Sequence, residues 1–245
     1  MMQLTDISLW GVLLVGLMLG VALSLFYVAD RRMFQRALRA LGLMTSQLAA
    51  LGACLWVVYE LDVWWASVLW ALSLSAAGGL LVARRAHQPW RRAMLPAGIA
   101  LITGSCLLAG CLLLAIPVST GPRLFAVLQS LLVSSMVQSL SSSFATYSAS
   151  LLHTEAHRRY LLANGASRLE SLVPSVRRAV RSAAVAQLQS MALPLLVVAP
   201  PFFGGQLIGG VSPLAAAAVA CLFMAAALAA SVLSVLLFIA VWERR

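Results

Sequence analysis

The sequence contains no lysine and only seven acidic residues among its 245 positions. All seventeen basic residues are arginine, and charged residues make up 10% of the chain, against about 25% in a typical soluble protein. Without lysine the chain cannot form the Schiff base of a retinal protein. The hydrophobic fraction of 62% indicates an integral membrane protein. The net charge of +10 could suggest nucleic-acid binding, but the distribution of the arginines along the chain argues against it.

Motifs for nucleotide binding and hydrolysis are also missing. The sequence has no G-x-x-x-x-G-K-[ST] stretch, so it does not bind ATP by that route, and it has no G-x-S-x-G nucleophile elbow. No acid–base pair lies within the apolar segments. We therefore expect no catalytic residues, no enzymatic activity and no cofactor on this chain.

Seven apolar blocks are each long enough to cross a bilayer, which takes about 20 residues. They cover residues 7–29, 40–59, 63–82, 93–116, 124–152, 183–203 and 213–241. None of them contains Asp, Glu, Arg or His, whereas ion-coupled transporters usually depend on buried ionisable residues. We predict an all-α protein with about seven transmembrane helices in a single domain over residues 1–245, and any uphill transport would need energy from a partner.

The arginines predict the orientation of the chain in the membrane. Sixteen of them fall within 31–39, 84–92, 158–181 and 244–245, whereas only Arg123 falls on the opposite side. The positive-inside rule then places the N-terminus outside and the C-terminus in the cytoplasm. The first block lacks a basic segment before it, so it reads as an anchor rather than a cleavable signal peptide.

Two residue types that often bind metals give weak signals here. The four cysteines all lie in apolar blocks, where small packing residues are the simplest interpretation. His153 and His157 are four residues apart, but the intervening Glu155 does not fit the H-E-x-x-H order and no third ligand is visible. We expect no metal site.

The longest interruption of hydrophobicity is the segment 155–182, which carries six arginines. A short helix is expected over Glu155–Ala163, with Asn164–Gly165 as its stop, because both residues tolerate a positive φ. Ser167 and Glu170 then have the S-x-x-E spacing of a capping box that begins the next helix. This helix, turn and basic helix between two membrane spans predict a protruding cytoplasmic segment, the knob, that docks into another protein.

The residues expected to make that partner contact lie in one short stretch. They are Arg158, Arg159, Leu161, Leu162, Asn164, Gly165, Ala166, Ser167 and Arg168. The arginines would orient the knob on an acidic rim of the partner. Alternatively, they only hold the topology and bind anionic lipid headgroups.

Several uncharged polar residues fall inside the apolar blocks and are candidates for lining a substrate path. They are Gln47, Ser134, Gln138, Ser141, Gln187, Gln189 and Ser190. The fifth block shows two serine-bearing faces, one with Ser130 and Ser134 and the other with Ser135 and Ser142. Small residues at helical spacing also allow close helix packing in membranes, so packing and a polar path both remain open. The glycine pairs at 204–205 and 209–210 predict the outer turn before the last span.

Several short motifs resemble the permeases of FetB-type ABC transporters. Leu162-Ala-Asn-Gly-Ala-Ser167, followed by Arg177 and Arg181, is similar to that family's LSLGAT…R…R segment. Residues 199–205 and 210–213 are similar to its LPGMMSG…GxDP segment, and Gly42, Gln47 and Gly52 fit its pattern in the second span. The resemblance covers nearly the whole chain. It implies a bacterial inner-membrane permease that forms a homodimer and is driven by cytoplasmic ATPase subunits, which would bind the ATP and magnesium.

The sequence departs from this family where a substrate would bind. Gln189 and Ala192 stand where the family has Asp and Lys, and a serine-rich run replaces the glycine-rich stretch of the fifth span. Family members are associated with iron export, but a site without carboxylates is a poor site for a hard cation. The resemblance therefore implies a permease, whereas a lipid-like, peptide or neutral organic solute fits the site at least as well as iron.

The alternative to transport is a membrane scaffold or assembly subunit that moves no solute. Its apolar helices would serve as packing surfaces, and its polar residues would join helices to one another. Association with an ATPase separates the two hypotheses, because only the permease requires it.

Overall fold

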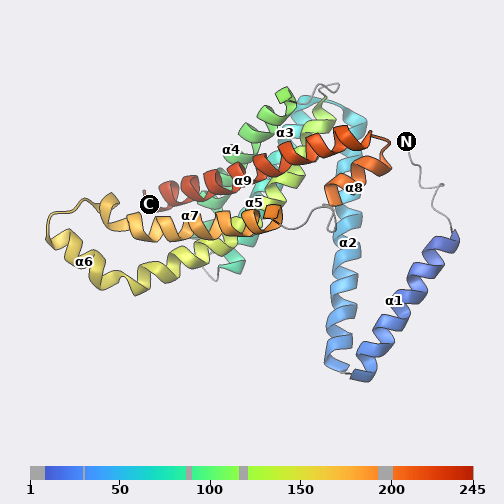
Figure 1. The fold of residues 1–245 in the computed structure, drawn as a ribbon, viewed down its shortest axis with the longest axis horizontal. Coiled ribbons are helices and arrows are strands. Elements are labelled where there is room, and N and C mark those ends of the chain that lie inside the picture. Colours follow the sequence, from blue (N-terminus) through green and yellow to red (C-terminus); the bar gives the residue numbers. More distant parts are fainter. Residues whose placement is uncertain (1–8, 30, 87–89, 116–120, 193–200, 245) are drawn as a thin grey trace. The chain divides into compact units, whose positions relative to one another are not determined.

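The computed structural model describes residues 9–29, 31–86, 90–115, 121–192 and 201–244. Within these ranges the structure is all-helical and contains no strand (Figure 1). The helices are α1 (Leu9–Ala29), α2 (Arg31–Leu61), α3 (Trp64–Arg85), α4 (Trp90–Ala115), α5 (Pro122–His153), α6 (Glu155–Ala163), α7 (Arg168–Ala192), α8 (Pro201–Ile208) and α9 (Pro213–Glu243).

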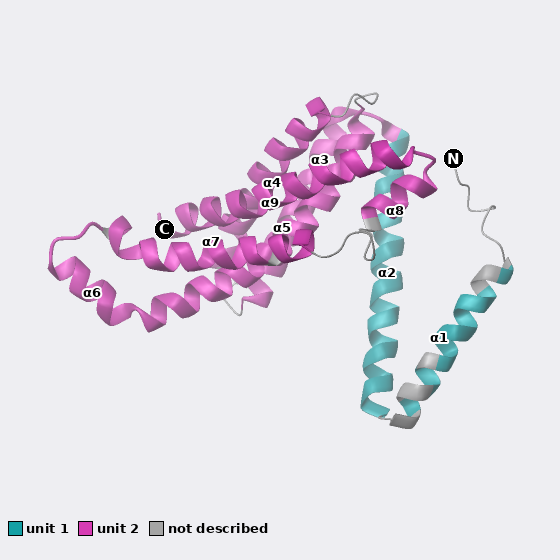
Figure 2. Ribbon diagram, in the orientation of Figure 1, with its two compact units in different colours: residues 1–60 teal, residues 61–245 magenta. Residues whose placement is uncertain are grey.

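The chain divides into two compact units, residues 1–60 and 61–245 (Figure 2). The first unit holds α1 and nearly all of α2, with an edge-to-face contact between Tyr27 and Phe34 at 5.5 Å. In α2 the basic segment 31–39 and the predicted span 40–59 form one continuous helix. Most of the α2 side chains that the structure describes are exposed, as a helix needs when lipid or another subunit is to surround it.

In the second unit, α5 is the helix around which the others pack. It contacts α3, α4, α7 and α9, and also the short α6. Its buried side chains are both apolar, such as Leu132, Met136 and Leu140, and polar, such as Gln129 and Ser143. Because α5 is buried on several sides, polar side chains on its remaining face stand out as candidates for function.

Glycine allows α3 and α4 to approach each other closely. A Cβ on Gly79 would lie 2.7 Å from the carbonyl oxygen of Met94 and 3.0 Å from the backbone nitrogen of Gly98. At Gly78, an added Cβ would lie 2.8 Å from side-chain atoms of Leu101 and Val137. Small residues at such crossings are typical of helix packing in membranes, where backbones meet without a large side chain between them.

Hydrogen bonds identify the two ends of the second unit. At one end, Ser67 near the start of α3 donates to the carbonyl of Pro122 at the start of α5, at 2.8 Å. At the other end, Tyr147 of α5 donates to the carboxylate of Glu243 at the end of α9, at 2.7 Å. On the Glu243 side, α3 ends in Arg84 and Arg85, and Arg244 follows α9, whereas Arg123 pairs with Asp62 on the Ser67 side.

Five of the described helices are long and apolar enough to cross a membrane, which makes the chain a multi-pass membrane protein. They are Arg31–Leu61, Trp64–Arg85, Arg92–Ala115, Pro122–His153 and Pro213–Glu243. The predicted number of seven is therefore not reproduced. The first predicted block forms α1, which is not among the five helices. Of the sixth predicted block, only residues 183–192 and 201–203 are described.

Only two parts of the predicted sixth span, residues 183–203, lie in the part of the chain that the structure describes. Its beginning belongs to α7, which starts at Arg168 and so continues the basic segment, and its end belongs to α8. Residues 193–200, with two of the three prolines of this block, lie outside the described residues. The prediction that Gly204 and Gly205 form a turn is wrong, because both lie within α8. Gly209 and Gly210 do form the turn before α9, with Gly210 at φ +84°.

Replacing Gly79 with alanine should lower the free energy of unfolding by roughly 1–3 kcal/mol, since the added methyl group would overpack the α3–α4 crossing. The measurement is the melting temperature of the purified protein in a mild detergent. Gly110→Ala on α4 is the matched control, because nothing lies within 4 Å of a Cβ at that position. Equal melting temperatures for both variants would contradict the close backbone approach.

Candidate functional site

The helix α6 ends in a turn that its sequence dictates. The backbone N–H of Ala166 donates to the carbonyl of Leu161 at 3.0 Å, and the N–H of Gly165 donates to that of Leu162 at 3.2 Å. These two bonds define a Schellman motif, in which the residue at the Gly165 position takes a left-handed conformation. Gly165 has φ +85°, whereas the space around it is open. Glycine is thus needed here for its conformation rather than for its small size.

A capping box begins α7 immediately after this turn. The backbone N–H of Ser167 donates to the carboxylate of Glu170 at 2.7 Å, and the N–H of Glu170 is 3.3 Å from the Ser167 hydroxyl that accepts it. The helix boundaries, the stop at Asn164–Gly165 and the capping box are all confirmed. Arg168 is the first residue of α7.

The short helix α6 contacts only α5 and α7 among the described helices, and none of its nine residues is buried. Tyr160 and Leu162 expose 66% and 40% of their surface, so both are accessible to another molecule. Leu161 and Arg158 are half-buried. Arg159 forms an ion pair with Glu155 on α6 itself, so its charge is partly compensated without a partner.

One face of α5 is both polar and exposed. Ser134, Gln138 and Ser142 are exposed at spacings of four residues, and we refer to these three residues as the α5 polar face. The sequence pattern placed Ser134 and Ser142 on different faces, and that prediction is wrong. It also grouped Ser130 with Ser134, but Ser130 is half-buried and accepts a hydrogen bond from the Trp70 indole at 3.0 Å.

The other predicted path residues of the second unit do not all join this face. Ser141 is buried and donates to the carbonyl of Val137 on its own helix. Gln187 is half-buried and donates to the Ser231 hydroxyl of α9 at 3.4 Å, and Ser190 donates to the carbonyl of Gln187. These three side chains therefore serve packing within the bundle. Gln189 is exposed instead, on the side of α7 that faces α5.

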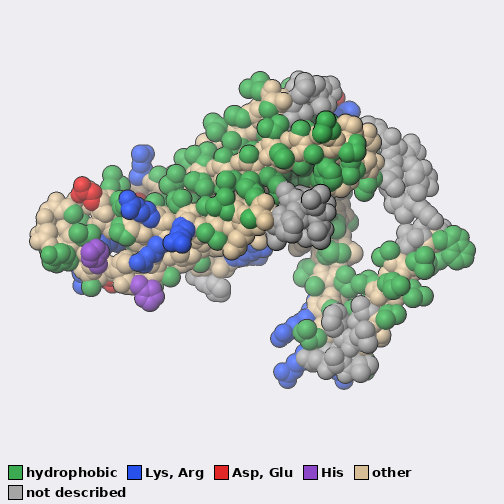
Figure 3. All heavy atoms as spheres, in the orientation of Figure 1, with side chains coloured by type: hydrophobic (Ala, Val, Ile, Leu, Met, Phe, Trp, Pro, Cys, Tyr) green, Lys and Arg blue, Asp and Glu red, His purple; other side chains and the backbone are tan. Residues whose placement is uncertain are grey.

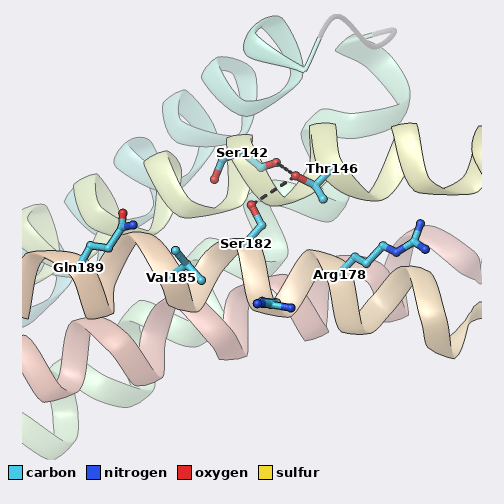
Figure 4. A pocket seen from close by; sticks show the side chains of 7 residues that line it. Ser142, Thr146, Arg178, Ser182, Val185 and Gln189 are labelled. Atoms are coloured by element: carbon cyan, nitrogen blue, oxygen red, sulfur yellow. Dashed lines mark hydrogen bonds between the residues drawn. The ribbon is translucent and has the colours of Figure 1, made fainter.

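An open hollow of about 490 Å³, which we call the α5–α7 hollow, lies between those two helices. Ser142 and Thr146 line it from α5. From α7 it is lined by Arg178, Arg181, Ser182, Val185 and Gln189, and Val185 lies between Ser182 and Gln189 along the helix (Figure 4). The Thr146 hydroxyl lies 3.3 Å from the Ser182 hydroxyl. The sequence pattern did not connect Thr146 and Ser182, which lie thirty-six positions apart.

Comparison with known proteins adds a family to this geometry. The model of the family described as Uncharacterised protein family (UPF0014) matches residues 9–245. The chain belongs to UPF0014. This family is of the ABC-transporter permease type. No curated protein and no solved structure matched the chain.

Membership of UPF0014 agrees with the distribution of charge over the second unit. Within the second unit, the face seen in Figure 3 is largely hydrophobic along α4 and α9, whereas arginine and histidine side chains gather over the end of α5, α6 and α7. No group of three His, Cys, Asp or Glu side chains within the described ranges could hold a metal ion. The predicted absence of a metal site stays a prediction.

Two further positions of this UPF0014 protein differ in what the sequence revealed about them. Gln47, a predicted path residue, belongs to the first unit, where it is exposed on α2 beside Met44 and Leu48. Gln129 of α5 is fully buried and donates to the Ser105 hydroxyl of α4 at 2.7 Å. Nothing in the local sequence singles out this bond, because the two residues come from different helices.

The capping box should make the start of α7 sensitive to pH. The Ser167 backbone N–H and then the Ser167 side chain hold the pKa of Glu170 below its usual range. A lowered folded-state pKa stabilises the fold above the unfolded value of about 4.3, and that stabilisation is lost as the pH falls through the folded value. We expect Glu170→Gln to accelerate amide hydrogen exchange over residues 165–172 at pH 7, with the difference from wild type vanishing as the pH falls below about 4.

Glu155→Gln is the matched control for this measurement. It removes the same charge from α6, but it breaks only the exposed pair with Arg159. Its effect should stay within α6. A Glu170→Gln protein that exchanges like wild type at pH 7 would show that the Glu170 charge does not stabilise the turn, because the glutamine amide oxygen can still accept from the Ser167 N–H.

Proposed function

We propose that this chain is the membrane-spanning permease subunit of a FetB-type ABC transporter in the bacterial inner membrane, with its N-terminus outside and its C-terminus in the cytoplasm. Two copies would form a homodimer that exports a solute. The chain itself would have no enzymatic activity, and cytoplasmic ABC ATPase subunits would bind and hydrolyse ATP with magnesium. In this proposal α6 is the coupling helix that transmits their motion.

The observation that carries this proposal is the exposure of α6, together with the hydrogen bonds that terminate it. This helix joins α5 to α7, it buries none of its own residues, and a Schellman motif and a capping box fix the turn after it. A helix that contributes nothing to the core and is nevertheless held this firmly is suited to receive force from another protein. The contact stretch from Arg158 to Arg168 would supply Tyr160 and Leu162 as apolar anchors.

The α5 polar face supports the transport part of the proposal. Polar side chains that face lipid are costly, so on a membrane-spanning helix they usually face a water-filled cavity or another protein. Ser134 and Gln138 are exposed on a helix whose other sides are packed. We infer that a second copy of the chain faces them across the substrate path. The lack of carboxylates there favours a neutral or amphiphilic solute over a hard cation.

Gly165→Val should abolish co-purification of the proposed cytoplasmic ABC ATPase. A β-branched residue at φ +85° costs at least about 1–2 kcal/mol in backbone strain and would open the turn. The measurement is the ratio of ATPase to permease in a mild-detergent pull-down, together with the ATPase rate of the complex. Gly165→Asn should retain both, since asparagine tolerates the left-handed conformation.

Gly110→Val is the matched control, with the same added side chain in an open site on α4. Equal ATPase recovery with Gly165→Val and with Gly110→Val would refute α6 as the coupling helix. Recovery of the wild-type protein without any ATPase, across several detergents, would instead favour a membrane scaffold.

Gln138→Cys, in a protein whose four native cysteines are replaced by alanine, should react with a membrane-impermeant maleimide if the α5 polar face lines an aqueous path. Leu107→Cys is the matched control, because Leu107 is also exposed, at 57%, on the apolar surface of α4. We expect labelling at position 138 to exceed that at 107 by about tenfold or more, in proportion to the access of water to the thiol. Equal labelling of the two thiols would contradict an aqueous path along α5.

A further inference from the structure

The α5–α7 hollow contains more hydrogen-bond donors than its surroundings use. Arg181 is exposed and forms no hydrogen bond or ion pair within the described part of the chain. Arg178 donates one N–H to the Ser150 hydroxyl at 3.1 Å. Because a guanidinium carries five N–H donors, others remain for a ligand. The single proton of the Thr146 hydroxyl lies nearest the Ser142 carbonyl, at 2.9 Å, and only a longer contact of 3.3 Å joins Thr146 to the Ser182 hydroxyl, which can therefore turn toward a ligand. Gln189 adds an exposed amide.

No carboxylate lines the hollow to balance these two positive charges. The four described carboxylates of the second unit have other partners. Asp62 pairs with Arg123, Glu155 pairs with Arg159, Glu170 caps α7, and Glu243 accepts from Tyr147. Two guanidinium groups and a hydroxyl around one concave site are the donor set that recognises a phosphate group.

The direction of α7 indicates which kind of phosphate fits. Within two turns of Arg181 the exposed side of the helix carries aliphatic side chains, Val185 and Leu188, which expose 40% and 49% of their surface beside the amide of Gln189. A change from arginine to exposed aliphatic side chains along a helix matches the passage from lipid headgroups to acyl chains. A free phosphate would use the arginines but would leave this apolar strip uncovered.

We propose that the α5–α7 hollow is a specific binding site for one anionic phospholipid molecule. Its phosphate lies between Arg178 and Arg181 and accepts a hydrogen bond from Ser182, and its acyl chains lie along Val185 and Leu188. This proposal rests on the membrane location of the chain and not on transport, so it stands whether or not an ATPase binds α6.

The test is lipid binding by the full chain, purified in detergent and stripped of lipid, measured by native mass spectrometry with dioleoyl phosphatidylglycerol. Wild type should retain one lipid, and Arg181→Gln should weaken its binding by about tenfold, the loss expected for a charge-assisted hydrogen bond. Ser182→Ala should weaken it by about threefold, the loss expected for an ordinary hydrogen bond.

Arg177→Gln is the matched control, because it removes the same charge from the neighbouring position, which lines a different hollow with Ile239 and Glu243. Its affinity should stay within about twofold of wild type if the site is specific. Equal weakening by Arg177→Gln and Arg181→Gln would overturn the proposal in favour of diffuse attraction, as would the absence of a retained lipid from wild type.

Two further ligands distinguish the sources of the phosphate. Dioleoylglycerol, which has the same acyl chains without the phosphate, should not be retained. Retention of both lipids with equal affinity would overturn the role of the arginines. Displacement of phosphatidylglycerol by inorganic phosphate at low millimolar concentration would show that the hollow binds the free anion, and this would overturn the assignment to a lipid.

Discussion

Polar groups within a bilayer have no water to bond, and this constraint governs how the serine-rich helices of this protein are built. Most of their hydroxyls bond to a carbonyl three or four residues earlier on the same helix, as Ser130, Ser135 and Ser141 do. Each hydroxyl is thereby satisfied locally, and the helix surface around it stays small. Helices can then approach through these positions, although the hydroxyls of Ser75 and Ser143 and the amide oxygen of Gln129 are buried without a partner among the described residues.

Several side chains form hydrogen bonds between helices, and these bonds join helices that also pack against one another. Gln129 joins α5 to α4, Gln187 joins α7 to α9, and the Ser150 hydroxyl donates to Ser175 at 3.1 Å to join α5 to α7. The polar residues of α5 therefore have two roles. Those at its packed sides hold the bundle together, whereas those of the α5 polar face stay exposed. Both explanations of the intramembrane serines, packing and a polar path, apply to different residues of one helix.

The parts of this structure that the sequence predicts well are those that depend on neighbouring residues. The ends of α6, the positive φ at Gly165 and the capping box of Ser167 and Glu170 all follow from interactions over at most five positions. The family resemblance likewise predicted a permease-type membrane protein. The orientation of the helices in the membrane and the coupling role of α6 stay predictions.

Pairing between distant helices was not predictable in the same way. The periodicity of α5 suggested two serine faces, but the contacts with Trp70 and Ser105 select a different exposed set. The α5–α7 hollow was missed because its lining residues come from two helices that are well separated along the chain. The glycines at 204 and 205 misled the turn prediction, since glycine is tolerated within a helix as well as after its end, and α8 contains both.

The turn after α6 has a mechanical consequence. The Schellman bonds hold the backbone up to Ala166, and the capping box holds it from Ser167 onward, so the joint between the two helices is the Ala166–Ser167 junction, which none of these hydrogen bonds spans. A load applied to α6 would therefore turn α6 about this one short joint before it passes along the axis of α7. The bond from Gln187 to Ser231 would then deliver the displacement to α9 on the far side of the bundle.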